Sequence, residues 1–270
     1  MNEFLFSVDL EDPQGSGDRL AVLTGRYLDF LARHRAAATF FATGDVACRH
    51  PDLIRRITAE GHEIACHSDR HLALEKQDPA GFRDDLQRNR DALHAAGAGE
   101  VRGYRAPFLS LVERTRWAYP VLAELGFLYS SSVLPGRSPL FGWPGFGAEP
   151  RRIDGVLEIP ISLLPVPGLG LPSAGGVYFR VLPEALLARA WRASRRAASP
   201  LVGYFHPYDL DTEGEWTAFP GYSRFSPSNI LLHLNRGSVL ARLERLIECG
   251  FAIRTYREFA SSAPGGTIER

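Results

Sequence analysis

Two histidines four residues apart are the residues of this sequence best suited to hold a metal ion. His67 and His71 stand at positions i and i+4, so a single helical turn would present both imidazoles to one ion. A nearby carboxylate would complete a catalytic site with open positions, of a kind that suits Zn²⁺, Fe²⁺ or Co²⁺. Spacing alone is a weak signal, because such a pair often arises by chance in a chain with eight histidines.

Carboxylates follow the first apolar run of the chain. Asp9, Glu11 and Asp12 come after Phe4, Leu5 and Phe6, where a charge costs several kcal/mol unless it is paired or bound to metal. Arg105, which also follows a short apolar run, is the obvious partner for Asp9. Carboxylates after a strand also commonly cap the next helix, so this cluster alone does not define a site.

A third histidine ends a later apolar run. His206 follows Leu201–Phe205 and precedes Pro207, which stops the strand there. Taken singly, His206 is better interpreted as a satisfied core histidine.

Short apolar runs alternate with longer amphipathic stretches along the whole chain, which predicts β-α units around a parallel sheet or barrel. We expect strands at 4–8, 38–41, 63–66, 102–104, 127–129, 156–160, 201–205 and 252–254, and helices at 19–35, 50–60, 79–96, 115–125, 183–197 and 238–248. The carboxyl ends of parallel barrel strands meet on one face, where Asp9, His67, Arg105 and His206 would converge. The Pro- and Gly-rich stretch 134–176 is expected to be an irregular excursion that shapes a substrate pocket.

Composition predicts one α/β domain spanning residues 1–270. The chain is 45% hydrophobic and carries 31 basic and 31 acidic residues, a formal net charge of +0. This balance removes the general electrostatic argument for nucleic acid or an anionic membrane as the main partner. No stretch has the pattern of a signal peptide or the length of a membrane span, so we expect a cytoplasmic location and no membrane insertion. The sequence does not specify an oligomeric partner.

Read together and in order, these segments resemble the polysaccharide deacetylase superfamily, also called the NodB homology domain or carbohydrate esterase family four. The resemblance spans nearly the whole chain. It is carried by residues 38–44, 61–67 with His71, 102–107, 126–132 and 205–207, which look like five motifs of that family in their usual order.

The resemblance implies a distorted (β/α) barrel, a bound divalent metal and hydrolytic removal of an acetyl group. Zinc is the first expectation for the metal, with iron, cobalt or nickel as alternatives. By this analogy His67 and His71 are ligands, Asp9 is the general base that takes a proton from water, Arg105 orients Asp9, and His206 is the general acid. The backbone N–H of Phe108 is the candidate donor to the oxyanion.

Two positions depart from the usual motifs. Where the family commonly has adjacent aspartates, this chain has Asp9-Leu10-Glu11-Asp12, a variant that resembles cytoplasmic and exopolysaccharide-associated members. Strand alternation favours Glu11 as the carboxylate ligand, and Asp12 is equally suitable if the strand has already ended.

The second departure is Ser130, at a position where related sequences commonly have an aspartate that polarises the acid histidine. Either another carboxylate, such as Asp209 or Asp211, takes over that role, or the pKa of His206 is lower than in relatives.

The leading functional hypothesis is an enzyme that deacetylates an N-acetylated or O-acetylated sugar during assembly of a glycan. Pro107, Phe108, Trp143 and Phe146 are the candidates for contact with the sugar. The alternatives are hydrolysis of another non-peptide C–N bond, as in a ureide or cyclic imide, and a degenerate barrel that only binds glycans.

Overall fold

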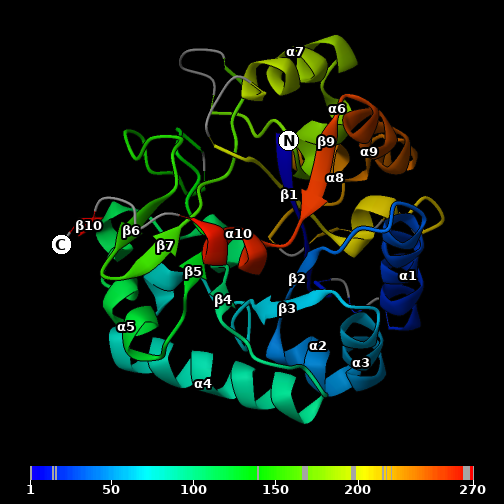
Figure 1. Cartoon of the computed structure of the whole chain (residues 1–270). Helices are drawn as coiled ribbons and strands as arrows, with labels where there is room; N and C mark the ends of the chain where they lie inside the picture. Colours follow the sequence, from blue (N-terminus) through cyan, green and yellow to red (C-terminus); the bar gives the residue numbers. More distant parts are fainter. Residues whose placement is uncertain are drawn as a thin grey trace.

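The computed structural model describes residues 2–13, 15, 17–138, 140–165, 170–195, 199–214, 216, 218–219, 221–263 and 268–269. Within this part of the chain a ten-stranded sheet runs in the order β10-β6-β7-β5-β4-β3-β2-β1-β8, and β9 pairs with β1 outside that path. The ends of this order do not pair with each other, so the sheet is a curled, open half-barrel (Figure 1).

Strand β1 (Asn2–Leu10) is the centre of the sheet. Its first half pairs in parallel with β9 (Phe251–Arg254), its second half with β2 (Thr39–Ala42), and β8 (Leu201–Phe205) lies along its other edge. The run of apolar residues that predicted a buried strand therefore has neighbours on both edges, as parallel strands require.

The remaining strands continue the sheet away from β1. They are β3 (Glu63–Cys66), β4 (Gly103–Tyr104), β5 (Tyr129–Ser130), β6 (Arg151–Ile153), β7 (Val156–Glu158) and β10 (Ile268–Glu269). Only β6 and β7 pair antiparallel among the described strands. The central strands thus all end on the same edge, which is where ionisable side chains can collect.

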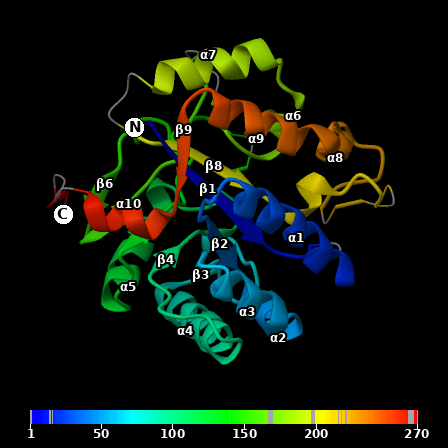
Figure 2. The same ribbon diagram turned by 45° about the vertical axis from the view of Figure 1, so that its right-hand side comes forward.

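Helices pack around the sheet. They are α1 (Asp18–Arg33), α2 (Gly44–Arg49), α3 (Pro51–Ala59), α4 (Pro79–Ala95), α5 (Ala118–Glu124), α6 (Gly176–Val181), α7 (Glu184–Ser194), α8 (Pro227–His233), α9 (Val239–Glu248) and α10 (Tyr256–Ser262). Figures 1 and 2 show α1 to α5 following one another around the outside of β1 to β5, with α6 to α9 grouped on the side of β8. No described helix combines the length and the apolar character needed to cross a membrane.

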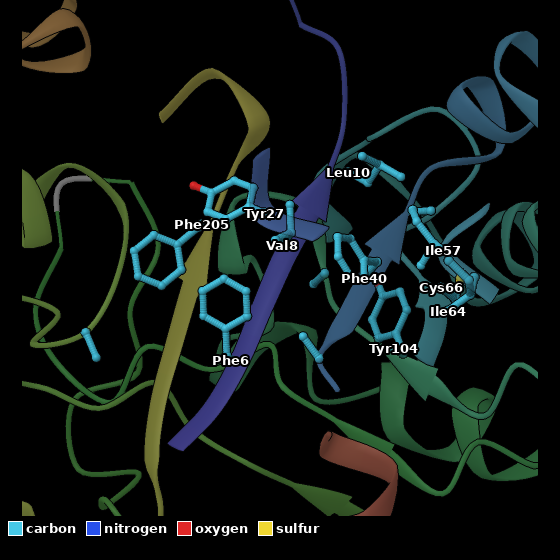
Figure 3. Close-up of a cluster of buried hydrophobic side chains, with 14 of the residues drawn as sticks. Phe6, Val8, Leu10, Tyr27, Phe40, Ile57, Ile64, Cys66, Tyr104 and Phe205 are labelled. Carbon is cyan, nitrogen blue, oxygen red and sulfur yellow. The ribbon is translucent and has the colours of Figure 1, made fainter. Parts of the chain in front are cut away.

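Alternation along β1 divides its side chains between two cores. Phe6, Val8 and Leu10 point toward the helices and pack in the larger core, where the Phe6 ring stacks on Phe205 at 5.2 Å (Figure 3). Leu5 lies in a smaller core on the concave face, and Asp9 is two pleats further along that same face. The strand therefore delivers one apolar face to the helices and one face that ends in a charge.

Helix α10 closes the concave face from below. Its Tyr256 packs edge-on against Phe41 at 5.4 Å and stacks on Tyr129 at 5.7 Å. The Glu63 carboxylate, also buried, accepts hydrogen bonds from the Tyr129 hydroxyl at 2.8 Å and the Thr39 hydroxyl at 2.6 Å. This contact joins β2, β3 and β5 beneath the site.

The predicted α/β fold is confirmed, and β1 to β5, β7 to β9, α1, α3 to α5, α7 and α9 lie where strands and helices were expected, within a few residues. The prediction missed α2, α6, α8, α10, β6 and β10, which are short or begin at Gly or Pro and so carry little periodic signal. Residues 196–197 of the helix expected at 183–197 lie outside the described residues. One sheet includes strands from both halves of the chain. The single domain expected for residues 1–270 stays a prediction.

Tyr129→Phe tests the polar contact under the sheet. Removing the hydroxyl takes one donor from the buried Glu63 carboxylate, so we expect the free energy of unfolding to fall by about 1–3 kcal/mol. Denaturant unfolding measures this change. Tyr222→Phe, in a surface turn, serves as the control and should change it by less than about 0.5 kcal/mol. Equal effects of the two substitutions would contradict the importance of the Glu63 contact.

Candidate active site

Asp9 and Arg105 form a buried ion pair at the carboxyl ends of β1 and β4. Arg105 Nη1 donates to Asp9 Oδ1 at 2.7 Å, and the two side chains are almost fully buried. Arg105 was expected to be the partner of Asp9, and the structure brings the two together. Burial of either charge alone would cost several kcal/mol, so each requires the other.

Neutral groups satisfy the rest of the Arg105 guanidinium. It donates to the Ser131 carbonyl at 2.8 Å, to the Ser7 hydroxyl at 2.6 Å and to the Tyr256 hydroxyl at 2.8 Å. Its carbon also lies 4.1 Å from the centre of the Phe41 ring, a cation–π contact. These contacts fix Arg105 and, through it, the direction of the Asp9 carboxylate.

Glu11, His67 and His71 bring three possible ligand atoms within 4.8 Å of one another. His71 Nε2 lies 2.5 Å from Glu11 Oε2, and the two imidazole rings are 4.9 Å apart. Among the described residues this is the one group of three or more His, Cys, Asp or Glu side chains arranged in this way. A two-histidine, one-carboxylate set suits a divalent metal in a catalytic site.

The two histidines are not on a helical turn, so that part of the prediction was wrong. They lie on the loop after β3, where Ser68 and His71 adopt left-handed conformations with φ of 66° and 53°. The Ser68 hydroxyl accepts from the His71 amide at 2.8 Å, and Asn89 Nδ2 donates to the Ser68 carbonyl at 2.7 Å. A braced loop, and not a helix, therefore turns both rings toward Glu11.

The protonation states of His67 and Glu11 suit metal binding. Burial lowers the pKa of His67 to about 4, so its ring is neutral at pH 7. His67 Nδ1 lies 2.9 Å from the Arg105 carbonyl oxygen, which can only accept, so Nδ1 carries the proton and Nε2 keeps its lone pair. Burial alone would raise the pKa of Glu11, but His71, His206 and His67 outweigh it and lower that pKa to about 2.

A buried, unsatisfied oxygen also fits a metal ion here. Glu11 Oε2 is buried and has no partner in hydrogen-bond geometry, although His71 Nε2 is close. Buried carboxylate oxygens in native proteins normally have a hydrogen bond or a metal ion. The donor set and this atom together fit a divalent metal.

Asp12 lies outside this group. Its carboxylate is 3.1 Å from Arg49 Nη1, and it was kept above as an equal alternative to Glu11. Strand β1 ends at Leu10, yet Glu11 still turns toward the histidines, so the geometry favours Glu11 over Asp12 as the carboxylate ligand.

His206 completes the group of residues at the strand ends. Its Nε2 lies 3.7 Å from Glu11 Oε1, and its Nδ1 lies 3.4 Å from Asp209 Oδ2. Burial lowers the pKa of His206, but Asp209, Glu11 and Asp9 outweigh burial and raise it. Asp209, not Asp211, is the carboxylate beside His206, since Asp211 pairs with Arg19. The alternative that the pKa of His206 is lower than in relatives stays a prediction.

Of the residues expected to contact a sugar, Phe108 alone is well exposed. Its side chain is 52% exposed, and its ring lies 4.6 Å from His71. Phe108 and Leu109 both have positive φ, 58° and 54°, a strained arrangement for bulky residues that is common at functional sites.

Pro107, Trp143 and Phe146 do not fit that role. Pro107 is buried, and Trp143 is 8% exposed and packs edge-on against Phe146 at 5.0 Å in the large core. The prediction for these three was wrong because aromatic residues in an irregular segment can pack inward as easily as outward.

A cavity of about 360 Å³ opens beside the histidine pair. Glu11, Asp12, Thr43, Asp69 and His71 are among the residues that line it. A pocket with ionisable groups at its edge has the size and position of a substrate site.

Sequence comparison relates the first part of the chain to a known family. A family model described as "Polysaccharide deacetylase" matches residues 16–129, and one described as "Domain of unknown function" matches residues 131–260. The structure is similar in fold to the crystal structure of a protein described as a polysaccharide deacetylase from Mycobacterium smegmatis, with a TM-score of 0.62, 23% identity, and coverage of 98% of this chain and 94% of that one. The resemblance to the polysaccharide deacetylase superfamily seen in the ordered motifs is thus confirmed.

Curated relatives match about a third of the chain. A chitooligosaccharide deacetylase from Rhizobium leguminosarum is 38% identical over 95 residues, 32% of this chain and 44% of that protein. A peptidoglycan-N-acetylglucosamine deacetylase from Bacillus cereus is 30% identical over 96 residues, 35% of each chain. The chain thus spans less than half the length of these relatives.

Sequence reasoning did not find Arg180, Ser131 or Tyr256, which contact Asp209 or Arg105. Arg180 is a single arginine in a short helix, and no pattern distinguishes it from other arginines. Asp209 was considered as a partner of His206, and its position three residues after His206, at the end of a strand, was the available signal.

Metal content of two variants tests the choice between Glu11 and Asp12. Glu11→Ala removes a candidate ligand, so we expect bound metal to fall to near zero after dialysis. Asp12→Ala should keep at least half of the metal, since Asp12 contacts Arg49. Elemental analysis of both purified proteins measures this, and loss of metal in Asp12→Ala alone would reverse the assignment.

Proposed function

We propose that this chain is a metal-dependent hydrolase that removes an acetyl group from an N-acetylated, or alternatively O-acetylated, sugar of a glycan. The observation that carries the proposal is a buried carboxylate–arginine pair beside a Glu-His-His group, with a third histidine opposite. The names of the curated relatives support an N-acetylated glycan as the substrate class. A cytoplasmic location remains part of the proposal.

Glu11, His67 and His71 would hold the metal, with zinc as the proposed ion and iron, cobalt or nickel as alternatives. When bound, such an ion supplies Lewis acidity that polarises the acetyl carbonyl and activates water.

Asp9 is the proposed general base. Its Oδ1 accepts a hydrogen bond from Arg105, which leaves the other oxygen to accept a proton from the attacking water. Both side chains of the pair are almost fully buried, so the surrounding packing fixes the position of the Asp9 carboxylate.

His206 is the proposed general acid. Asp209 beside Nδ1 leaves Nε2 facing Glu11 and the centre of the site, where it can deliver a proton to the departing amine or alcohol. The Phe108 amide is the proposed donor to the oxyanion, and the exposed Phe108 ring the proposed sugar contact.

Two substitutions separate metal binding from proton transfer. Asp9→Asn should retain bound metal and lose acetate release by about 10²–10⁴-fold, since it removes the base and keeps its shape. His67→Ala should lose both metal and acetate release. Acetate release from a panel of N-acetylated and O-acetylated sugars, with metal analysis of the same samples, measures both.

Adding a ureide and a cyclic imide to this panel separates the alternatives. Hydrolysis of either compound, measured as formation of the ring-opened carboxylate, without acetate release from the sugars would favour the other C–N hydrolase. Glycan binding with neither product in the wild-type protein would favour a degenerate binding barrel.

A matched pair of aromatic substitutions tests where the sugar lies. Phe108→Ala removes an exposed ring next to His71, so we expect KM to rise roughly tenfold, about 1.4 kcal/mol, with little change in stability. Trp143→Leu should leave KM unchanged and lower the free energy of unfolding by about 1–3 kcal/mol, since Trp143 is in the core. A KM increase confined to Trp143→Leu would contradict the assignment of Phe108.

A further inference from the structure

The second half of the chain, which matches a model of unknown function, supplies one side of the candidate site. Its strand β8 lies along β1 and ends directly before His206. His206, which lies in the region matched by this second model, is therefore fixed to the same sheet as Asp9. The same region also supplies the residues that surround the His206 ring.

Asp209 is the first of these contacts. It is 1% exposed, and its Oδ2 accepts from the His206 backbone amide at 2.8 Å while lying 3.4 Å from the ring Nδ1. The same carboxylate oxygen thus accepts from the backbone amide of His206 and lies close to its ring. Tyr208 stacks on the other side, with its ring 4.5 Å from the His206 ring and nearly parallel to it.

Arg180 holds the other oxygen of Asp209. Its guanidinium is fully buried, and Nη2 lies 3.0 Å from Asp209 Oδ1 in a close ion pair without hydrogen-bond geometry. Nη1 donates to the carbonyls of Leu234 at 2.7 Å and Leu232 at 3.2 Å. The backbone of Arg180 is held as well, because Asn235 Nδ2 donates to its carbonyl at 2.6 Å.

This arrangement restricts the rotation of Asp209. A buried carboxylate without a cation would cost several kcal/mol or take up a proton, and a protonated Asp209 would no longer be an acceptor only. Because Oδ1 is paired with Arg180, the carboxylate is oriented so that Oδ2 faces His206. At Ser130, the position where relatives commonly carry an aspartate, the hydroxyl instead donates to Ser132.

We propose that the region of residues 131–260 supplies the acid half of the active site, with Arg180 as a positioning residue that holds Asp209 and, through it, the ring of His206. The inference rests on the proposed deacetylase function for its kinetic part only. Arg180 would act without touching the substrate, in the manner of the outer-shell partners that orient catalytic histidines.

A double-mutant cycle on kcat tests the kinetic part. With a soluble N-acetylglucosamine oligomer and metal-loaded protein, Arg180→Met should lower kcat by about 10- to 100-fold and change KM by less than about twofold. Arg180→Lys should recover part of kcat. In an Asp209→Asn background, Arg180→Met should lower kcat no further, because Arg180 acts on His206 only through the Asp209 carboxylate.

Arg242→Met is the matched control for stability. Arg242 Nη1 donates to the Leu182 carbonyl at 2.9 Å at the end of the helix that carries Arg180, without a described contact to Asp209. This variant should lower the melting temperature and leave kcat unchanged. If Arg180→Met and Arg242→Met reduce activity only in proportion to the unfolded fraction, or if the effects of Arg180→Met and Asp209→Asn on kcat multiply, the proposal fails.

Nitrogen NMR of the His206 ring separates this proposal from the proposed function, since it needs no turnover. In folded wild-type protein at a pH where the ring is neutral, the proton should reside on Nδ1, and Arg180→Met should shift the tautomer population toward Nε2–H. An unchanged tautomer in folded Arg180→Met would overturn the role of Arg180 even in an active enzyme. The expected shift in a protein that releases no acetate would support Arg180 and reject the deacetylase.

Discussion

Burial of the Arg105 guanidinium is the constraint on which the rest of the structure depends. A charge with no access to water needs an opposite charge and an acceptor for each of its donors, and these come from β1, from the segment after β5 and from α10. The concave side of the sheet is built to satisfy Arg105. The same contacts fix the Asp9 carboxylate at the end of the central strand, so what stabilises the fold also positions the candidate base.

The candidate metal group is linked to this ion pair by a backbone atom. The Arg105 carbonyl fixes His67 through Nδ1, which leaves Nε2 free to bind an ion beside Glu11. The opposite side of the site has a similar arrangement. There a buried arginine, Arg180, pairs with Asp209, and Asp209 lies beside the site residue His206. Each half of the proposed chemistry is thus supported by a buried arginine that does not itself react.

Patterns of residue type predicted most strands, the longer helices and the convergence of Asp9, His67, Arg105 and His206, because apolar periodicity and strand ends are local properties of sequence. The helical turn expected for His67 and His71 was wrong, since the loop has left-handed conformations at Ser68 and His71 and is held partly by a hydrogen bond from Asn89, which is distant in sequence. Trp143 was misplaced for a similar reason, as only packing decides which way a loop aromatic faces. The choice between Glu11 and Asp12, and the contacts of Arg180, required the geometry of the folded chain.

A crystal structure of the metal-loaded protein, with diffraction data on both sides of the metal absorption edge, tests the central claim most directly. The account predicts one anomalous peak about 2.0–2.2 Å from Nε2 of His67, Nε2 of His71 and a Glu11 oxygen, with Asp9 still paired to Arg105 and not a ligand. A metal bound through Asp12, or an Asp9 carboxylate that leaves Arg105 to bind the ion, would contradict it.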